Sequence, residues 1–223
     1  MYAAALAPAA QRRLRVRQAV VQLMSEYGFR FSMDAVAERV GCSKQTLYSQ
    51  FGSKQALMRS AMLEELALAT VRLDVDANDL RAGLLGFATD QLERLSDPTL
   101  VAACKLVNAE AHLYPEEARS LFTDACEKLL ERLAAWLQAA MRRGQLRHDD
   151  PHMAAELLLS MISGLDFERQ RFNLPYRDSD ASRRQWAEFV VDAFLRAFAP
   201  SATHVRDAVP SHRKLDPTIL KNN

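Results

Sequence analysis

A short run of polar residues carries the side chains in this sequence that are best suited to binding chemistry. Positions 43–50 read SKQTLYSQ, in which seven of the eight side chains carry a hydrogen-bond donor or acceptor and none is acidic. Hydroxyl, amide and ammonium groups suit the phosphates and base edges of DNA. The run therefore predicts a nucleic-acid interface made of Ser43, Lys44, Gln45, Thr46, Tyr48, Ser49 and Gln50.

Two short helices joined by a sharp turn are expected to position these side chains. Ser32 and Ser43 are plausible N-caps, and Gly41 stops the first helix. Apolar residues lock the pair at a steep angle, which frees the second helix to enter a major groove. A generic helical hairpin with a polar face remains an alternative on this pattern alone. The positions expected to face inward are Val36, Ala37, Val40, Leu47 and Phe51.

The charge of the chain is unevenly distributed. Its 223 residues have a formal net charge of +1, yet residues 1–60 hold nine Lys or Arg and three Asp or Glu. A basic N-terminal quarter on a mildly acidic body suggests a polyanion-binding head on a carrier domain. The cluster Arg12–Arg17 could contact neighbouring phosphates or a minor groove, or could be a solvated basic arm.

Several classes of protein find no support in the sequence. Its three cysteines are far apart without a CxxC pair, which suits free thiols in a reducing cytosol. No apolar run is long enough for a membrane helix, so we expect a cytoplasmic protein without a membrane partner. Residues 1–10 are interpreted as a frayed leader rather than a signal peptide. No GxSxG elbow or Gly-rich phosphate loop is present, so neither catalysis nor a cofactor is expected.

A possible metal cluster lies between the predicted helices near residue 150. His148, Asp149, Asp150 and His152 have the right chemistry for a metal ion. The pair Asp150-Pro151 is better explained as the start of a helix, with the acid at the N-cap and proline at the first helical position. We therefore expect no metal here.

The rest of the chain reads as longer amphipathic helices, so the predicted fold class is all-α. Asp97-Pro98 begins one helix, and another runs from Pro115 to Arg142. The final amphipathic helix includes Trp186 and Phe194. The predicted organisation is a flexible leader (1–11), a helix-turn-helix DNA-binding domain (12–58), a ligand-binding and dimerisation domain (59–198) and a loose tail (199–223).

The segment around the polar run resembles the DNA-binding domain of the TetR/AcrR transcriptional regulators. The family run is Gly-x-Ser-x-x-Thr-Leu-Tyr-x-x-Phe-x-x-Lys, and the resemblance covers about residues 12–62. It implies about nine helices, with a three-helix head, a larger bundle and homodimerisation through the last two helices. It also implies binding to a palindromic operator and release by a small-molecule inducer. The matching positions are Gly41, Ser43, Thr46, Leu47, Tyr48, Phe51 and Lys54.

The resemblance implies phosphate contacts for several of these residues. Tyr48 matches a tyrosine whose hydroxyl contacts a backbone phosphate, although a core tyrosine is the alternative. Thr46 matches a threonine that contacts phosphate or base edges. Lys54 matches a lysine at a helix start, where the ammonium and the helix N-terminus together favour phosphate. Ser32 matches a cap residue that often contacts phosphate, or it is simply a cap.

The resemblance also implies which residues read bases. Lys44, Gln45 and Ser49 occupy variable positions of the second short helix. Lys suits guanine and Gln suits adenine, so Lys44 and Gln45 are expected to make direct base contacts. Gln50 stands where many family members carry histidine.

The C-terminal half resembles the AefR-like C-terminal type. Polar or polarisable residues on mostly apolar helix faces suit a pocket between bundle helices, and the alternative for each is core filler or a buried, satisfied polar group. The candidate ligand-binding residues are Phe87, Gln91, Cys104, Asn108, His112, Phe122, Cys126, Trp136 and Met161.

Apolar stripes on the last two predicted helices suggest a homodimer. Two such helices paired with their two-fold copies make a four-helix interface, unless both stripes only complete the core of one protomer. The predicted interface residues are Leu158, Met161, Ile162, Leu165, Trp186, Phe189, Val190 and Phe194. The resemblance implies a ligand-responsive repressor, and the alternative is a helical small-molecule carrier or enzyme with an incidental basic head.

Overall fold

The computed structural model describes residues 8–70, 73 and 79–200. All regular secondary structure in these ranges is helical, as predicted for an all-α protein. The helices are α1 (Pro8–Tyr27), η1 (Gly28–Arg30), α2 (Met33–Val40), α3 (Lys44–Phe51), α4 (Lys54–Ala69), α5 (Leu80–Leu95), α6 (Pro98–Glu110), α7 (Pro115–Phe122), η3 (Thr123–Glu127), α8 (Lys128–Arg142), α9 (Pro151–Arg171) and α10 (Asp180–Ala197).

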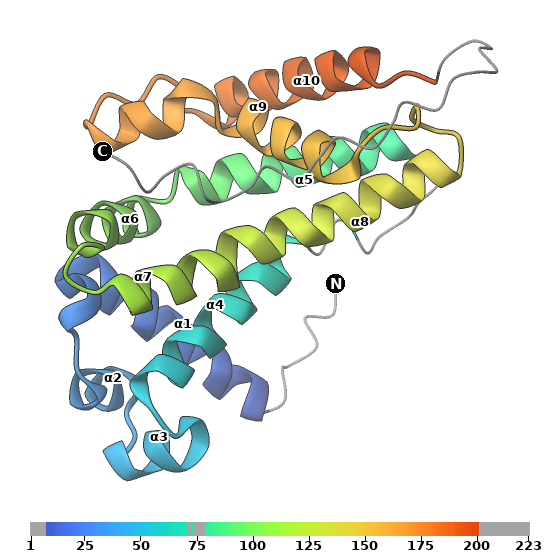
Figure 1. The fold of residues 1–223 in the computed structure, drawn as a ribbon. Coiled ribbons are helices and arrows are strands. Elements are labelled where there is room, and N and C mark those ends of the chain that lie inside the picture. Colours follow the sequence, from blue (N-terminus) through green and yellow to red (C-terminus); the bar gives the residue numbers. More distant parts are fainter. Residues whose placement is uncertain (1–7, 71–72, 74–78, 201–223) are drawn as a thin grey trace, which may run out of the picture.

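The N-terminal helices form a small head with its own core. In Figure 1, α2 and α3 lie at one end of the molecule, and α9 and α10 lie at the opposite end. The first helix supplies buried residues such as Val20 and Leu23, and α2 and α3 add Val36 and Leu47. Burial of each such side chain contributes about 1.5–3 kcal/mol, so this apolar cluster fixes the angle between α2 and α3.

A second core lies between α5, α8, α9 and α10. Its fully buried side chains include Leu84 and Phe87 from α5, Leu137 from α8, and Phe194 from α10. Two proline-led helix starts predicted from sequence are present: the carboxylates of Asp97 and Asp150 cap α6 and α9, which begin with proline. These caps fix where the bundle helices begin.

The predicted helix from Pro115 to Arg142 is continuous but contains a π-helical segment. Residues at both junctions keep right-handed helical angles, so α7, η3 and α8 form one rod with a single-turn bulge. Counted in this way, the described residues contain nine α-helices. A π-bulge shifts the face that a helix presents and is common at functional positions.

A sharp kink divides α9 at Gly164. Its backbone angles (φ 53°, ψ −162°) are outside the helical region and accessible only to glycine. The indole of Trp186 lies against this glycine, and a Cβ added to Gly164 would be 3.1 Å from Trp186 Cζ2. Trp186 Nε1 donates to the carbonyl oxygen of Ile162 (3.0 Å). The tryptophan therefore occupies the kink and satisfies a backbone acceptor there.

Side-chain packing, as well as the connecting chain, joins the head to the bundle. Ala61 and Met62 of α4 and Ala103 and Val107 of α6 belong to the head core, so packing does not divide at the predicted 58/59 boundary. Residues 8–11 of the predicted leader are helical, and α1 begins at Pro8. Residues 1–7 of the leader and 201–223 of the predicted tail lie outside the described residues.

Candidate nucleic-acid interface

Serine caps and a left-handed glycine set the angle between α2 and α3. Ser32 Oγ accepts from Ala35 N (3.1 Å) at the start of α2, and Ser43 Oγ accepts from Thr46 N (3.0 Å) at the start of α3. Gly41 has φ 74° and donates its N–H to the carbonyl oxygen of Ala37 (3.0 Å). This turn ends α2 and redirects the chain into α3.

The outward face of α3 carries most of the predicted DNA-binding residues. Leu47 is fully buried, whereas the Tyr48 side chain is 45% exposed and faces away from the core. Thr46 is partly buried, and its hydroxyl lies 2.8 Å from Ser43 Oγ. The exposed residues that accompany them are Ser32, Ser43, Lys44, Gln45, Ser49 and Gln50. The structure therefore brings this part of the predicted set together on one helix and its flank.

A hollow of about 500 Å³ lies beside α3 and is shared with the start of α1. Arg12 lines it together with Gln45, Thr46, Ser49 and Gln50 of α3. A guanidinium beside groove-compatible side chains is well placed for a phosphate next to the bases that α3 would read. Of the basic cluster Arg12–Arg17, Arg12 is thus the residue that the fold brings to the α3 face.

Lys44 is engaged by an acidic neighbour in the free protein. Its Nζ donates to Asp34 Oδ2 on α2 (2.7 Å), and this hydrogen bond raises the pKa of the Lys44 ammonium. Both side chains are exposed, so the pair is screened and adds little stability. Contact between Lys44 and a base requires exchange of the Asp34 carboxylate for the DNA acceptor.

Lys54 is half-buried and is engaged by the head in the free protein. Its ammonium points into the head, where it donates to the carbonyl oxygen of Phe29 and lies 4.6 Å from the centre of the Phe31 ring. Burial lowers the pKa of this ammonium. Lys54 therefore joins the start of α4 to the η1 segment, and a phosphate contact from its ammonium requires exchange of the Phe29 carbonyl for the DNA acceptor.

Glu110, at the end of α6, holds the η1 segment of the head. Its Oε2 accepts from Phe29 N (2.8 Å), and its Oε1 lies 2.7 Å from Arg30 Nε. Gly28 packs so closely that an added Cβ would be 2.1 Å from Glu110 Oε2, and its φ is 58°. Sequence reasoning missed Glu110 because a glutamate at a helix end looks like an ordinary surface acid.

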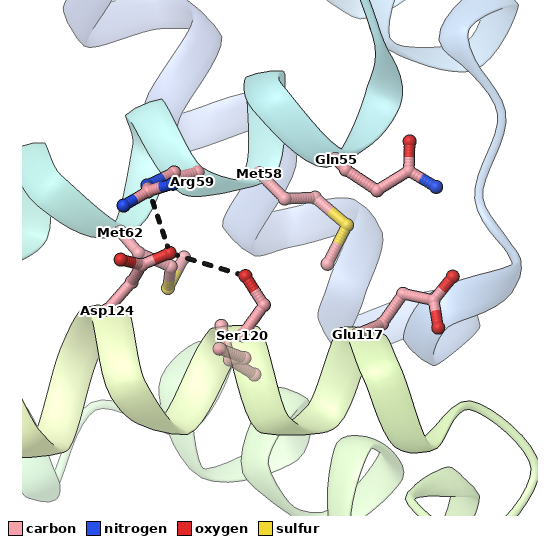
Figure 2. Close-up of a pocket in the computed structure, with 8 residues that line it drawn as sticks. Gln55, Met58, Arg59, Met62, Glu117, Ser120 and Asp124 are labelled. Carbon is pink, nitrogen blue, oxygen red and sulfur yellow. Dashed lines mark hydrogen bonds and ion pairs between the residues drawn. The ribbon is translucent and has the colours of Figure 1, made fainter.

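Asp124 makes a second link between the bundle and the head, at the π-helical segment (Figure 2). Its buried carboxylate lies 3.3 Å from Arg59 Nε on α4 and 2.6 Å from Lys128 Nζ. Ser120 Oγ donates to the same carboxylate (3.3 Å). The hollow beside these side chains has a volume of about 20 Å³, which holds about one water molecule and no larger ligand.

The predicted ligand-binding residues do not gather around one cavity of the described chain. Phe87 is fully buried, and Gln91 is buried with its Nε2 donating to the carbonyl oxygen of Ala69 (3.0 Å). Trp136 packs over Gly83, and Met161 packs against the bundle core. Cys104 is partly buried. The remaining four are exposed: Asn108, His112, Phe122 and Cys126. Their spacing in the sequence predicts positions on mostly apolar helix faces, but the tertiary packing places them in different surroundings.

The predicted dimer residues divide into two groups. One group lies in the bundle core, so these side chains are covered by their own protomer, which corrects the expectation for Leu158, Ile162, Val190 and Phe194. Trp186 and Met161 are partly buried. Leu165 and Phe189 remain exposed, at 71% and 59%. A helix face that fills its own core and one that meets a partner have the same spacing in sequence.

Two family models match this chain, one over the head and one over the bundle. Residues 17–61 match the family model for bacterial regulatory proteins of the tetR family, and residues 82–200 match the model for the C-terminal domain of AefR-like transcriptional repressors. The chain belongs to the TetR family. It is a transcriptional regulator rather than an enzyme, and regulators of this family bind DNA and often act as dimers.

Solved structures agree with this family. A putative TetR-family regulator from Mesorhizobium loti superposes with a TM-score of 0.69 at 25% identity, covering 87% of this chain and all of that one. The flavonoid-responsive regulator FrrA superposes with a TM-score of 0.66 at 31% identity, covering 86% of this chain and all of that one. An HTH-type transcriptional regulator of Mycobacterium bovis is 25% identical over 150 residues, 65% of this chain and 75% of that protein.

The carboxylate of Asp150 lies at the start of α9. Asp150 accepts from the backbone N–H groups of His152 and Met153, which agrees with its interpretation as a helix cap. Within the described ranges there is no cluster of three or more metal-ligating side chains. None of the helices described here is both long and apolar enough to cross a membrane.

Proposed function

We propose that this regulator is a homodimeric, cytoplasmic repressor that leaves a palindromic operator when a small molecule binds. The outward face of α3 carries the proposal. Gln45, Ser49 and Gln50 are exposed there without an acidic neighbour on the same helix, and Arg12 lines the adjoining hollow. This arrangement supports base contacts from α3 and phosphate contacts from its flanks.

An apolar surface on α9 and α10 supports the homodimer. Leu157 and Leu165 of α9 and Phe189 of α10 are exposed, although α9 and α10 also fill the bundle core. Large exposed apolar side chains on two helices in contact are typical of a protein interface. A two-fold copy docked there supplies a second α3, and a palindromic operator requires two such helices presented to successive major grooves.

The links between head and bundle support release by a ligand. Both Glu110 of α6 and Asp124 of η3 bind head residues through buried carboxylates. A ligand that favours a different position of either helix changes the spacing of the two heads. It needs only a few kcal/mol of preference for that state to release DNA. The similar regulator FrrA is described as flavonoid-responsive, which is consistent with a small-molecule signal here.

Fluorescence anisotropy with DNA from upstream of the chain's own gene tests the proposal. We expect tight, salt-dependent binding whose affinity falls on the order of 10³–10⁵-fold between 50 and 200 mM salt, and weaker binding to a scrambled duplex. Tyr48→Phe removes one phosphate contact and should weaken both duplexes equally. Equal affinity of the wild-type protein for the upstream and scrambled duplexes contradicts the proposal.

A further inference from the structure

A groove opens between α6, the end of α9 and the start of α10. Its volume is about 540 Å³, within the range of pockets that hold small organic ligands. Pro98, Val101 and Ala102 of α6 contribute an apolar wall. We call this hollow the α6–α10 groove. None of the predicted ligand-binding residues lines it.

Three cations from distant parts of the sequence meet in the α6–α10 groove. They are Lys105 of α6, Arg177 of the α9–α10 loop and Arg183 of α10, and the lining contains one carboxylate, Asp178. Lys105 Nζ donates to the Asn173 side-chain oxygen (2.7 Å), a neutral acceptor. Asp180 pairs with Arg183 from its solvent side. The lining therefore has an excess of positive charge next to an apolar wall.

Arg177 is a buried cation with an unpaired guanidinium nitrogen. Its guanidinium lies 3.8 Å from the centre of the Trp186 ring, which fixes its position. The nearby Asp166 carboxylate accepts from the backbone N–H groups of Tyr176 and Arg177 rather than from this guanidinium. Among the described residues, the buried atoms Arg177 Nη1 and Arg183 Nε have no hydrogen-bond partner. Such donors are uncommon and call for an acceptor.

We propose that the α6–α10 groove binds an amphipathic organic anion, with its carboxylate between Lys105, Arg177 and Arg183 and its apolar body against the α6 wall. Guanidinium and ammonium groups recognise carboxylates through charge-assisted hydrogen bonds. The role of this anion as the small-molecule signal rests on the proposed function. The binding itself does not depend on DNA.

The same helix connects this groove to the head. One face of α6 lines the groove through Val101, Ala102 and Lys105, and another face packs in the head core through Val107. Glu110 at its end holds the backbone of η1. A ligand that moves α6 in the groove therefore moves the segment that leads into α2 and α3.

Isothermal titration calorimetry of the full chain without DNA tests the site, using 2-naphthoate and its uncharged analogue 2-naphthamide as probes. We expect naphthoate to bind at least about tenfold more tightly than naphthamide. Lys105→Gln should weaken naphthoate at least about tenfold, as expected for the loss of one charge-assisted hydrogen bond to the carboxylate, and should leave naphthamide unchanged.

Arg184→Gln is the matched control, because Arg184 lies on the same helix as Arg183 but is not part of the groove lining and pairs with Glu188 on the surface. It should leave both probes unchanged. Equal binding of the two probes, or equal effects of Lys105→Gln and Arg184→Gln, overturns the inference. Selective binding of naphthoate that does not release operator DNA supports the groove and counts against the ligand response of the proposed function.

Discussion

Replacing Gly28 with alanine tests the link between α6 and the head. Gly28 has φ 58°, and an alanine Cβ would be 2.1 Å from Glu110 Oε2. The carboxylate is a flexible group, but it is held by Phe29 N (2.8 Å) and Arg30 Nε (2.7 Å). Gly28→Ala therefore displaces Glu110 and breaks these interactions.

The cost of Gly28→Ala can be divided into a backbone part and a contact part. A positive φ costs alanine about 1 kcal/mol. Loss of the hydrogen bond to the buried Phe29 N–H adds about 1–3 kcal/mol, and the solvent-exposed pair with Arg30 adds at most about 1 kcal/mol. We expect about 3 kcal/mol of lost stability in total. Gly41→Ala is the matched control, because φ is 74° and no atom lies within 4 Å of the added Cβ, so it should cost about 1 kcal/mol.

Urea unfolding at one protein concentration measures both costs, since a dimer's stability depends on concentration. The expected difference of about 2 kcal/mol corresponds to about 4–8 °C in Tm for a chain of this size. In a Glu110→Ala background the clash is absent, so Gly28→Ala should then cost the same as Gly41→Ala. A cost near 3 kcal/mol that persists without Glu110 refutes the reasoning.

Five further substitutions have expected outcomes. Gln45→Ala should reduce discrimination at one base pair by about 1–3 kcal/mol, as measured by anisotropy on single-site operator variants; an equal loss on all variants contradicts a base contact. Arg12→Gln should lower the slope of log Kd against log salt by about one, whereas Lys54→Met should leave that slope unchanged, because the half-buried Lys54 ammonium donates to the Phe29 carbonyl. Phe189→Glu should dissociate the proposed dimer in sedimentation velocity. Phe122→Glu, equally exposed at 57% but on α7, should not; equal effects argue against the α9–α10 interface.

The sequence predicted the features of the fold that depend on neighbouring residues. Ser32 and Ser43 cap α2 and α3, and Asp97 and Asp150 cap the proline-led helices, because an N-cap bonds to backbone two or three positions away. Gly41 ends α2 for an equally local reason. The helix-turn-helix and the all-α class follow from such signals.

Features that depend on the tertiary partner could not be predicted from spacing. The inward direction of Lys54 depends on the Phe29 carbonyl, which belongs to another segment of the head. Leu158 and Phe189 both lie on apolar stripes, yet one is in the core and the other is exposed. The α6–α10 groove joins Lys105 and Arg177 across a long stretch of sequence, so its charge is visible only after folding.

Hydroxyl-radical footprinting of the upstream DNA tests the central claim most directly, namely that two copies of α3 read one operator. The account predicts two protected patches on one face of the duplex, centred one helical turn (about 34–36 Å) or slightly more apart, with sequences related by a two-fold axis. A single patch, or protection that does not depend on sequence, contradicts it.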